Sequence, residues 1–335
     1  MIIEILIKIV GGMNMDENNI NDISLFISYS GSISNLSELL ENISEYEDLC
    51  EKYKTLSKIE RFNLNEKITD KQSILRRGIK LDNSVILQYI EPVKEFVASF
   101  GINYTLIESK LNSLELVISP VYLLEKGKLC NYGKYIAIDY SYAEFDENGN
   151  AIGLKEPIVN FFKHTIIHEL LHSISNKGLN YMDSFSEGMT EYFAHKISKA
   201  TNISSDYYGY IERIFYMFGT MIGDDILFED YVTDIYSMKK LREFTASLGI
   251  NEEEYKNFKL KLDNFLEKKF KQQNSEELRL LKSQIDEFIF NRIVMPYCSF
   301  DKTVAMEMVE GFFSTSEDIK LDLCEIHSNS KEKKL

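Results

Sequence analysis

The segment His168-Glu169-Leu170-Leu171-His172 combines residue types at a spacing suited to metal chemistry. Two histidines four positions apart in a helix lie one above the other on the same face, so their imidazoles can share one zinc ion. The glutamate after the first histidine can hold a metal-bound water and take its proton, and we expect Glu169 to be that base. The motif therefore predicts a zinc site that includes His168 and His172.

The flanking sequence predicts a mostly buried helix around this motif. Pro157 suits the first helical turn, because its missing N–H would have no partner there, and no helix breaker follows before Gly178. Apolar residues surround the motif on nearly every side, as in a helix that is buried all round. Unpaired polar groups inside such a helix cost about 1–3 kcal/mol each, and a metal ion would pair them. The alternative is a surface helix whose histidines face water.

A second segment, Ser184 to His195, carries the pattern E-G-M-T-E-Y from Glu187 onward. The H-E-x-x-H motif followed by this pattern resembles the gluzincin metallopeptidases. The resemblance implies that Glu187 is the third zinc ligand and that Glu191 orients a zinc-binding histidine, as carboxylates beside metal-bound imidazoles do. The two acids lie four positions apart, so both can face the metal-binding helix.

Two alternatives remain open for these acids. The spacing from His172 to Glu191 resembles the aminopeptidase branch of the gluzincins, in which Glu191 would be the ligand. Glu187 could instead complete a capping box at the start of its helix, with Ser184 as the N-cap. We prefer Glu187 as the ligand, because the local pattern matches better than the spacing and because loop lengths vary more easily than helix faces.

A zinc hydrolase also needs a hydrogen-bond donor for the oxyanion that forms when water attacks a carbonyl. Gluzincins often take this donor from after the glutamate helix, and Tyr208 and Tyr210 follow that helix here. The resemblance makes both tyrosines candidates for this role. The alternative is that they are ordinary aromatic residues at the start of a helix, in a chain with 20 tyrosines.

The remaining histidines are not expected to bind this ion. Positions 164 to 172 of a helix rise about 12 Å, so His164 cannot join both motif histidines on an ion with bonds of about 2 Å. We expect His164 to be a surface residue or a partner of the site, and His195 to be packed or hydrogen-bonded. His327 has no evident role.

The surrounding elements predict an α+β fold that resembles the zincin fold. A mixed α/β N-terminal half with a small sheet is followed by the active-site helix and then by a mainly helical C-terminal half. The expected elements are a strand (24–30), an acidic helix (35–60), an amphipathic helix (82–100) capped by Asp82 or Asn83 and ended by Gly101, strands (104–107, 114–119 and 135–141), a loop (146–150), and helices from Pro157 to about residue 313.

We assign residues 15–152 to the N-terminal lobe and 153–325 to the zinc-site helices and the helical lobe, with a disordered tail at 326–335. Tyr135–Ser141 is the last strand before the metal helix. It is our candidate for the sheet edge that pairs with an extended substrate in a cleft between the lobes. A place within the sheet core is the alternative for this strand.

The first 14 residues form a possible non-native or flexible extension. They make a poor signal peptide and are too short to span a bilayer. Their apolar alternation is also compatible with a strand. A third interpretation is that translation starts at Met15, since Gly11-Gly12 is what a ribosome-binding site would encode.

Composition narrows the class of partner. The net charge of −15 argues against a nucleic acid or an anionic membrane as the main partner. Four scattered cysteines without a C-x-x-C pair are typical of reduced thiols, so we expect a cytoplasmic protein. The richness in lysine, asparagine and isoleucine is typical of an AT-rich bacterial genome.

Together these features predict a metalloprotease that binds one Zn²⁺ per chain and hydrolyses a peptide or protein substrate with Glu169 as general base. The chain lacks the G-A-M-E-N motif of the aminopeptidase branch, which favours an endopeptidase. The alternative is a regulatory or interaction protein that binds zinc and cleaves nothing. Glu169 argues against that alternative, because a binding site has no need of a base there.

Overall fold

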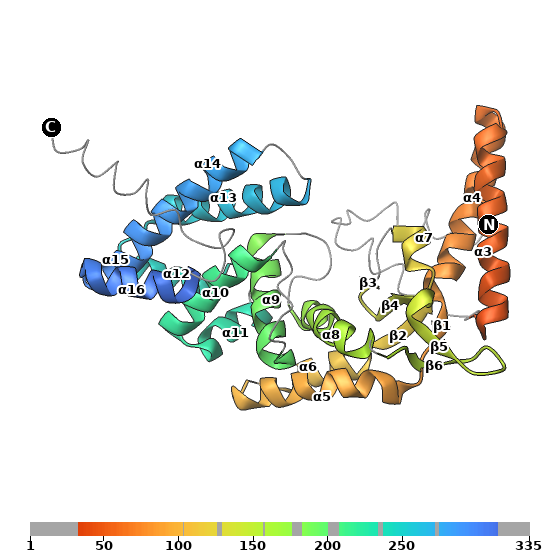
Figure 1. The fold of residues 1–335 in the computed structure, drawn as a ribbon, viewed down its shortest axis with the longest axis horizontal. Helices are drawn as coiled ribbons and strands as arrows, with labels where there is room; N and C mark the ends of the chain where they lie inside the picture. The colour runs from red at the N-terminus through yellow and green to blue at the C-terminus, as the bar shows by residue number, and fades with distance from the viewer. Residues whose placement is uncertain are drawn as a thin grey trace, which may run out of the picture.

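A computed structural model describes most of the chain between residues 33 and 313. The described ranges are 33–102, 104–125, 129–156, 158–175, 183–199, 208–233, 237–271 and 275–313. Within them the chain is mostly helical with a small mixed sheet, which confirms the general α+β class (Figure 1). The predicted strand at 24–30, the extension at 1–14 and the tail at 326–335 lie outside these ranges.

Two helices, α3 (Leu36–Thr55) and α4 (Lys58–Arg77), pack against each other at the N-terminal end of the described chain (Figure 1). The backbone is extended at Leu56, which ends α3. Ser57 and Glu60 then form a capping box that starts α4. The single acidic helix predicted here is therefore two helices.

The next helix, α5 (Asn83–Ser99), has the predicted ends. The Asp82 side chain accepts a hydrogen bond from the Ser84 N–H at its start, and Gly101 has a φ of +66° just beyond its end. By contrast, the strand predicted at 104–107 is wrong, because these residues belong to α6 (Tyr104–Asn112).

Helical spacing explains the correction at α6. Ile107 and Leu111 lie four positions apart and are both buried, so they share one face of a helix. This helix packs against the metal-motif helix. This tertiary contact thus favours a helical conformation, although the short apolar run at 104–107 is also compatible with a strand.

The sheet has the strand order β1-β2-β4-β3, in which β2 and β4 are parallel and the outer strands are antiparallel to their neighbours. Its strands are β1 (Ile79–Lys80), β2 (Glu115–Ser119), β3 (Leu129–Asn131) and β4 (Tyr135–Asp139). The prediction that Tyr135–Ser141 forms the free edge is wrong, because β4 is paired on both sides. The short strand β3 lies at this edge instead, and β1 forms the opposite edge.

Alternation along the strands gives the sheet two different faces. Leu116, Ile118, Ile136 and Ile138 point into the main core, where α5 packs against β2. The opposite face carries a small second core, covered in part by α7 (Val121–Glu125).

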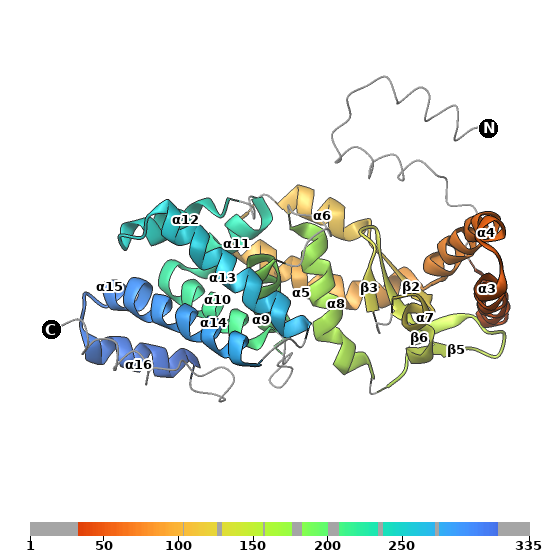
Figure 2. The same ribbon diagram turned by 90° about the horizontal axis from the view of Figure 1, so that it is seen from above.

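A hairpin leads from the sheet to the helix that carries the metal motif, so the prediction that Tyr135–Ser141 is the last strand before this helix is wrong. The hairpin consists of β5 (Ala143–Phe145) and β6 (Ala151–Leu154) around the predicted loop at 146–150. The motif helix α8 (Ile158–Ile174) packs against α5 and α6 on one side and α9 (Ser184–Ser198) on the other. Figure 2 shows α8 between the sheet and the C-terminal helices.

The remaining described chain is helical, as the sequence predicted. Its elements are α10 (Gly209–Ile222), α11 (Asp224–Thr233), α12 (Lys239–Ser247), α13 (Glu252–Phe270), α14 (Ser275–Phe288), a π-helical turn (Ile289–Val294), α15 (Met295–Tyr297) and α16 (Lys302–Phe313). Among the described helices, none has the length and apolar character needed to cross a bilayer.

Candidate metal centre

The metal motif lies on a helix that is buried on several sides. Ile166, Ile167, Leu170 and Leu171 of α8 are fully buried, as the apolar sequence predicted. The two motif histidines occupy the face of α8 that meets α9. The sequence therefore creates a helix that must present its polar groups to a neighbouring helix rather than to solvent.

Helix α9 is buried along almost its whole length, and Gly188 allows this close packing. A Cβ at Gly188 would lie 2.4 Å from Ile211 Cγ2 and 2.6 Å from Phe215 Cδ2, both on α10. Only glycine permits α10 to approach α9 this closely. The glycine of the E-G pair therefore has a packing role, next to the acid that faces the motif.

Three donor atoms converge between α8 and α9. His168 Nε2 lies 3.0 Å from His172 Nε2, and each of these nitrogens lies 3.5 Å from Glu187 Oε2. The ligand atoms of a tetrahedral ion with bonds of about 2.0–2.1 Å lie roughly 3.3 Å apart. The two nitrogens and one oxygen therefore fit three corners around one metal ion.

Glu191 lies on the other side of the His168 ring. Its Oε2 accepts a hydrogen bond of 2.8 Å from His168 Nδ1–H, and its Oε1 lies 3.1 Å from His164 Nε2. Within the described residues, Glu187 groups with both motif histidines, whereas Glu191 groups with His164 and His168. The geometry thus favours Glu187 over Glu191 as the acid that completes the motif pair.

The start of α9 leaves Glu187 available for this role. Asp183, not Ser184, is the N-cap, and its side chain accepts from the Ser186 N–H at 2.7 Å. Ser184 instead donates both its N–H and its hydroxyl to Asp263 Oδ1. The capping-box alternative for Glu187 is therefore not what forms.

Burial and pairing oppose each other in the electrostatics of this cluster. Burial alone would raise the pKa of Glu187, but the neighbouring imidazoles of His172 and His168 hold it well below its usual range. The pKa of Glu191 is lowered in the same way, against burial, by His164 and His168. Burial disfavours the charged form of His168, yet its bonds to Glu187 and Glu191 raise its pKa to about 10. The cluster therefore favours a bound positive charge.

A hydroxyl supports the second motif histidine from behind. Thr190 Oγ1 donates to the Ser186 carbonyl at 2.7 Å and lies 3.4 Å from His172 Nδ1 and 2.8 Å from the Tyr231 hydroxyl. A bond from His172 Nδ1–H to this oxygen leaves Nε2 facing the converging donors. Thr190 shares a helix face with Glu187, so its position could have suggested this role. Tyr231 lies on α11, and no sequence spacing pointed to it.

Glu169 lies beside the cluster on α8 and is half-buried. Its negative charge contributes to the raised pKa values of His168 and Tyr208. Its backbone carbonyl accepts a hydrogen bond of 2.8 Å from Asn131 Nδ2, which also lies 3.1 Å from Ser173 Oγ. This bond holds the edge strand β3 against the motif helix.

The structure separates the two candidate tyrosines. The ring of Tyr208 stacks on His168, with ring centroids 5.8 Å apart. Its hydroxyl bonds to Glu187, and burial followed by the charge of Glu187 raises its pKa far above the usual range. Tyr210 is not brought to the site, because its buried hydroxyl donates to Asp286 Oδ1 at 2.5 Å.

Of the other described histidines, His164 is a partner of the site rather than a surface residue, and His195 is hydrogen-bonded, as expected. His164 is buried, with Nδ1 3.2 Å from Ser198 Oγ. His195 Nδ1 lies 2.6 Å from Glu212 Oε1, and its ring centroid is 4.2 Å from that of His164. The contact between His164 and Glu191 was missed at the sequence level, although both lie on the stripes that face each other. His327 lies outside the described residues.

Comparison of the chain with protein-family models, curated proteins and solved structures gave no match. We therefore infer the candidate metal centre from this chain's own residues. Two imidazole nitrogens and one carboxylate oxygen converge. The second ring nitrogen of each imidazole contacts a neighbouring side chain, and Glu169 and Tyr208 lie beside the cluster.

Proposed function

We propose that this protein is a zinc-dependent peptidase of the gluzincin type on a zincin-like fold. The observation that carries the proposal is the convergence of His168 Nε2, His172 Nε2 and Glu187 Oε2 at separations of 3.0–3.5 Å. Three protein ligands leave a fourth tetrahedral position open, as catalytic zinc sites do.

The donor set favours zinc over a harder cation. Two imidazole nitrogens and one carboxylate suit zinc, whereas magnesium and calcium prefer oxygen ligands throughout. The hydrogen bonds behind the ligands support the same choice, because His168 has Glu191 and His172 has Thr190 at the ring nitrogen that faces away from the ion. Such partners set the tautomer of a metal-binding histidine.

Zinc held by these three residues would polarise a substrate carbonyl and lower the pKa of a bound water. Glu169 then takes a proton from the attacking water and passes it to the leaving amine. Tyr208, whose ring lies against His168, donates its hydroxyl hydrogen to the developing oxyanion. Glu191 keeps the His168 imidazole oriented throughout.

An extended peptide fits the neighbouring sheet edge. The strand β3 ends the sheet on the side where Asn131 bonds to Glu169. A peptide that adds to this edge gains backbone hydrogen bonds without regard to its sequence, and it would pass beside Glu169. We therefore place the substrate along Leu129–Asn131, rather than along β4.

Metal analysis and peptide cleavage together test this function. We expect the purified wild type to hold one zinc per chain and to cleave members of a peptide library, as read by mass spectrometry. The matched variant Glu169→Gln keeps the size of the side chain and removes the base. It should retain zinc and lose cleavage about 10²- to 10⁴-fold.

The outcomes separate the two classes of protein. Equal cleavage by wild type and Glu169→Gln would refute the catalytic role. Stoichiometric zinc without cleavage of any library member would favour the rival, a zinc-binding regulatory or interaction protein. Absence of zinc from the wild type, also after incubation with zinc, would refute the metal centre itself.

A further inference from the structure

Tyr231 is a buried tyrosine to which the mechanism above gives no role. It lies on α11, and its hydroxyl oxygen lies 2.8 Å from Thr190 Oγ1 on α9. Both residues are buried. Because a buried hydroxyl group needs hydrogen-bond partners, one of these two groups donates to the other, and the neighbouring atoms show which one does.

The contacts of Thr190 Oγ1 assign the protons around it. This oxygen lies 2.7 Å from the Ser186 carbonyl oxygen, 2.8 Å from the Tyr231 hydroxyl and 3.4 Å from His172 Nδ1. A threonine hydroxyl offers one proton and two acceptor sites. The carbonyl cannot donate, and two oxygens 2.7 Å apart repel each other unless a proton lies between them. The Thr190 proton therefore points to Ser186, and both Tyr231 and His172 donate to Thr190.

The surroundings of Tyr231 hold its hydroxyl in place as a donor. Burial raises the pKa of Tyr231 above its usual range, so the hydroxyl keeps its proton at neutral pH. The ring packs among aromatic side chains, with its centroid 5.8 Å from that of Phe193 and 5.9 Å from that of Phe228. Close packing of this kind restricts the ring, so the O–H group is presented to Thr190 from a fixed position.

The two motif histidines differ in the partner of the nitrogen that faces away from the ion. His168 Nδ1 meets Glu191, and a carboxylate can only accept, so this contact alone places the proton on Nδ1. His172 Nδ1 meets a hydroxyl, which is able to donate or to accept. A second donor that faces this hydroxyl is therefore needed to make Thr190 an acceptor toward His172.

We propose that Tyr231 is a positioning residue of the metal centre, which acts through Thr190 on His172. Tyr231 occupies one acceptor site of Thr190 Oγ1, so that a single site is left for the His172 Nδ1–H. This arrangement fixes the tilt of the imidazole and directs the free Nε2 lone pair toward the ion. The inference rests on the proposed function, because it requires His172 to be a metal ligand.

Competition with a zinc-binding indicator tests this role. Tyr231→Phe keeps the ring and removes the donor, and it should weaken zinc binding about two- to tenfold, the equivalent of one neutral hydrogen bond. Thr190→Val removes the hydroxyl next to the ligand and should weaken zinc binding about 10- to 100-fold. Thr190→Ser restores the hydroxyl and should bind zinc like wild type. A loss in Thr190→Ser equal to that in Thr190→Val would overturn the proposal.

A double variant tests whether Tyr231 acts through Thr190. In Thr190→Val, Tyr231→Phe, the zinc affinity should equal that of Thr190→Val alone, because the tyrosine then has no hydroxyl to act on. Residues in one hydrogen-bond network show such non-additive effects. Losses that add in the double variant would overturn the proposed path.

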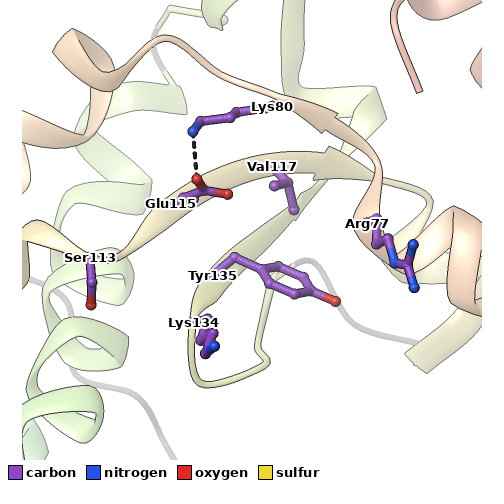
Figure 3. Close-up of a pocket in the computed structure, with 7 residues that line it drawn as sticks. All are labelled: Arg77, Lys80, Ser113, Glu115, Val117, Lys134 and Tyr135. Carbon is purple, nitrogen blue, oxygen red and sulfur yellow. Dashed lines mark hydrogen bonds and ion pairs between the residues drawn. The ribbon is translucent and has the colours of Figure 1, made fainter. Parts of the chain in front are cut away.

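Two tyrosines serve as controls. Tyr210 is also buried and donates to Asp286, so Tyr210→Phe should lower stability but leave zinc affinity unchanged. Figure 3 shows Tyr135 in a pocket whose lining also includes residues of α4, β1 and β2 and none of the metal centre, so Tyr135→Phe should also bind zinc like wild type. A loss of zinc affinity in Tyr231→Phe no greater than in Tyr210→Phe would overturn the positioning role.

The affinity series needs no peptide cleavage, so its result is separate from the peptidase activity. If wild type binds zinc and Tyr231→Phe binds it equally well, this inference alone is overturned. If wild type binds no zinc, the metal centre and this inference are overturned together.

Discussion

Glu187 and Glu191 of α9 should contribute differently to zinc affinity. We consider Glu187→Gln and Glu191→Gln, which keep the size of each side chain and remove one negative charge. Glu187 Oε2 lies 3.5 Å from both His168 Nε2 and His172 Nε2, whereas Glu191 Oε2 bonds to His168 Nδ1 at 2.8 Å. The first variant alters a donor to the ion, and the second alters only the partner of a ligand.

The magnitudes follow from these contacts. In Glu191→Gln, a charge-assisted hydrogen bond of about 1.5–3 kcal/mol becomes a neutral one of about 0.5–1.5 kcal/mol. The difference of about 1–1.5 kcal/mol is close to tenfold in affinity, at the low end of the 10- to 100-fold losses that follow changes behind a metal ligand. Breaking a buried charge pair costs about 3–5 kcal/mol. Glu187→Gln should therefore weaken zinc binding by roughly two to three and a half orders of magnitude.

Competition with a zinc-binding indicator at constant pH measures both losses. Glu212→Gln is the matched control: Glu212 is also buried and paired with a histidine, His195, but it has no atom in the ligand cluster. It should bind zinc like wild type. A greater loss in Glu191→Gln than in Glu187→Gln would refute the assignment of Glu187 and restore the alternative based on spacing.

Three further expectations concern the tyrosines, the packing of α9 and pH. Tyr208→Phe should lower kcat about 10²- to 10³-fold with zinc content unchanged. Tyr210→Phe should keep kcat but lose about 1–3 kcal/mol of stability, because the buried Asp286 Oδ1 loses its hydrogen-bond donor, although Lys282 still pairs with Oδ2. Equal kcat values for the two variants would remove Tyr208 from catalysis. Gly188→Ala should lower the free energy of unfolding in denaturant by about 1–3 kcal/mol, since its Cβ would meet α10 side chains at 2.4–2.6 Å. An unchanged unfolding midpoint would show that α10 shifts to accommodate the methyl group. For the metal-free protein, pairing raises the pKa of His168 to about 10 from a usual value of 6.5, so its contribution to stability is complete below pH 6.5 and is lost as pH rises toward 10. The melting temperature with a chelator present should decrease over this pH range, and the decrease should be smaller in His168→Gln. An equal decrease in wild type and variant would contradict the assignment of this pH dependence to His168.

Local signals predicted some elements well and others poorly. The cap at Asp82, the stop at Gly101 and the long helices after Pro157 were predictable, because capping and helical periodicity are properties of neighbouring residues. The strand predicted at 104–107 failed because helical packing against α8 outweighed a four-residue apolar run. Such short runs do not distinguish a strand from a buried helix.

The strand order was beyond local reasoning as well. The edge strand β3 has only three residues, too few for a recognisable alternation, so it was not predicted. The short hairpin strands β5 and β6, which follow β4, were missed as well, and β4 was therefore taken as the last strand before the motif. Pairing of β3 with β4 is a long-range choice made by backbone hydrogen bonds. Because of this pairing, the sheet edge lies at Leu129–Asn131 and not at Tyr135–Ser141, as was expected.

The sequence by itself determined that His168 and His172 share one helix face and that Glu187 and Glu191 share another, because both spacings equal about one helical turn. Tertiary structure alone decided which acid meets which nitrogen of His168, since that depends on how α9 crosses α8. It also brought Tyr208 to the cluster while burying Tyr210 against Asp286.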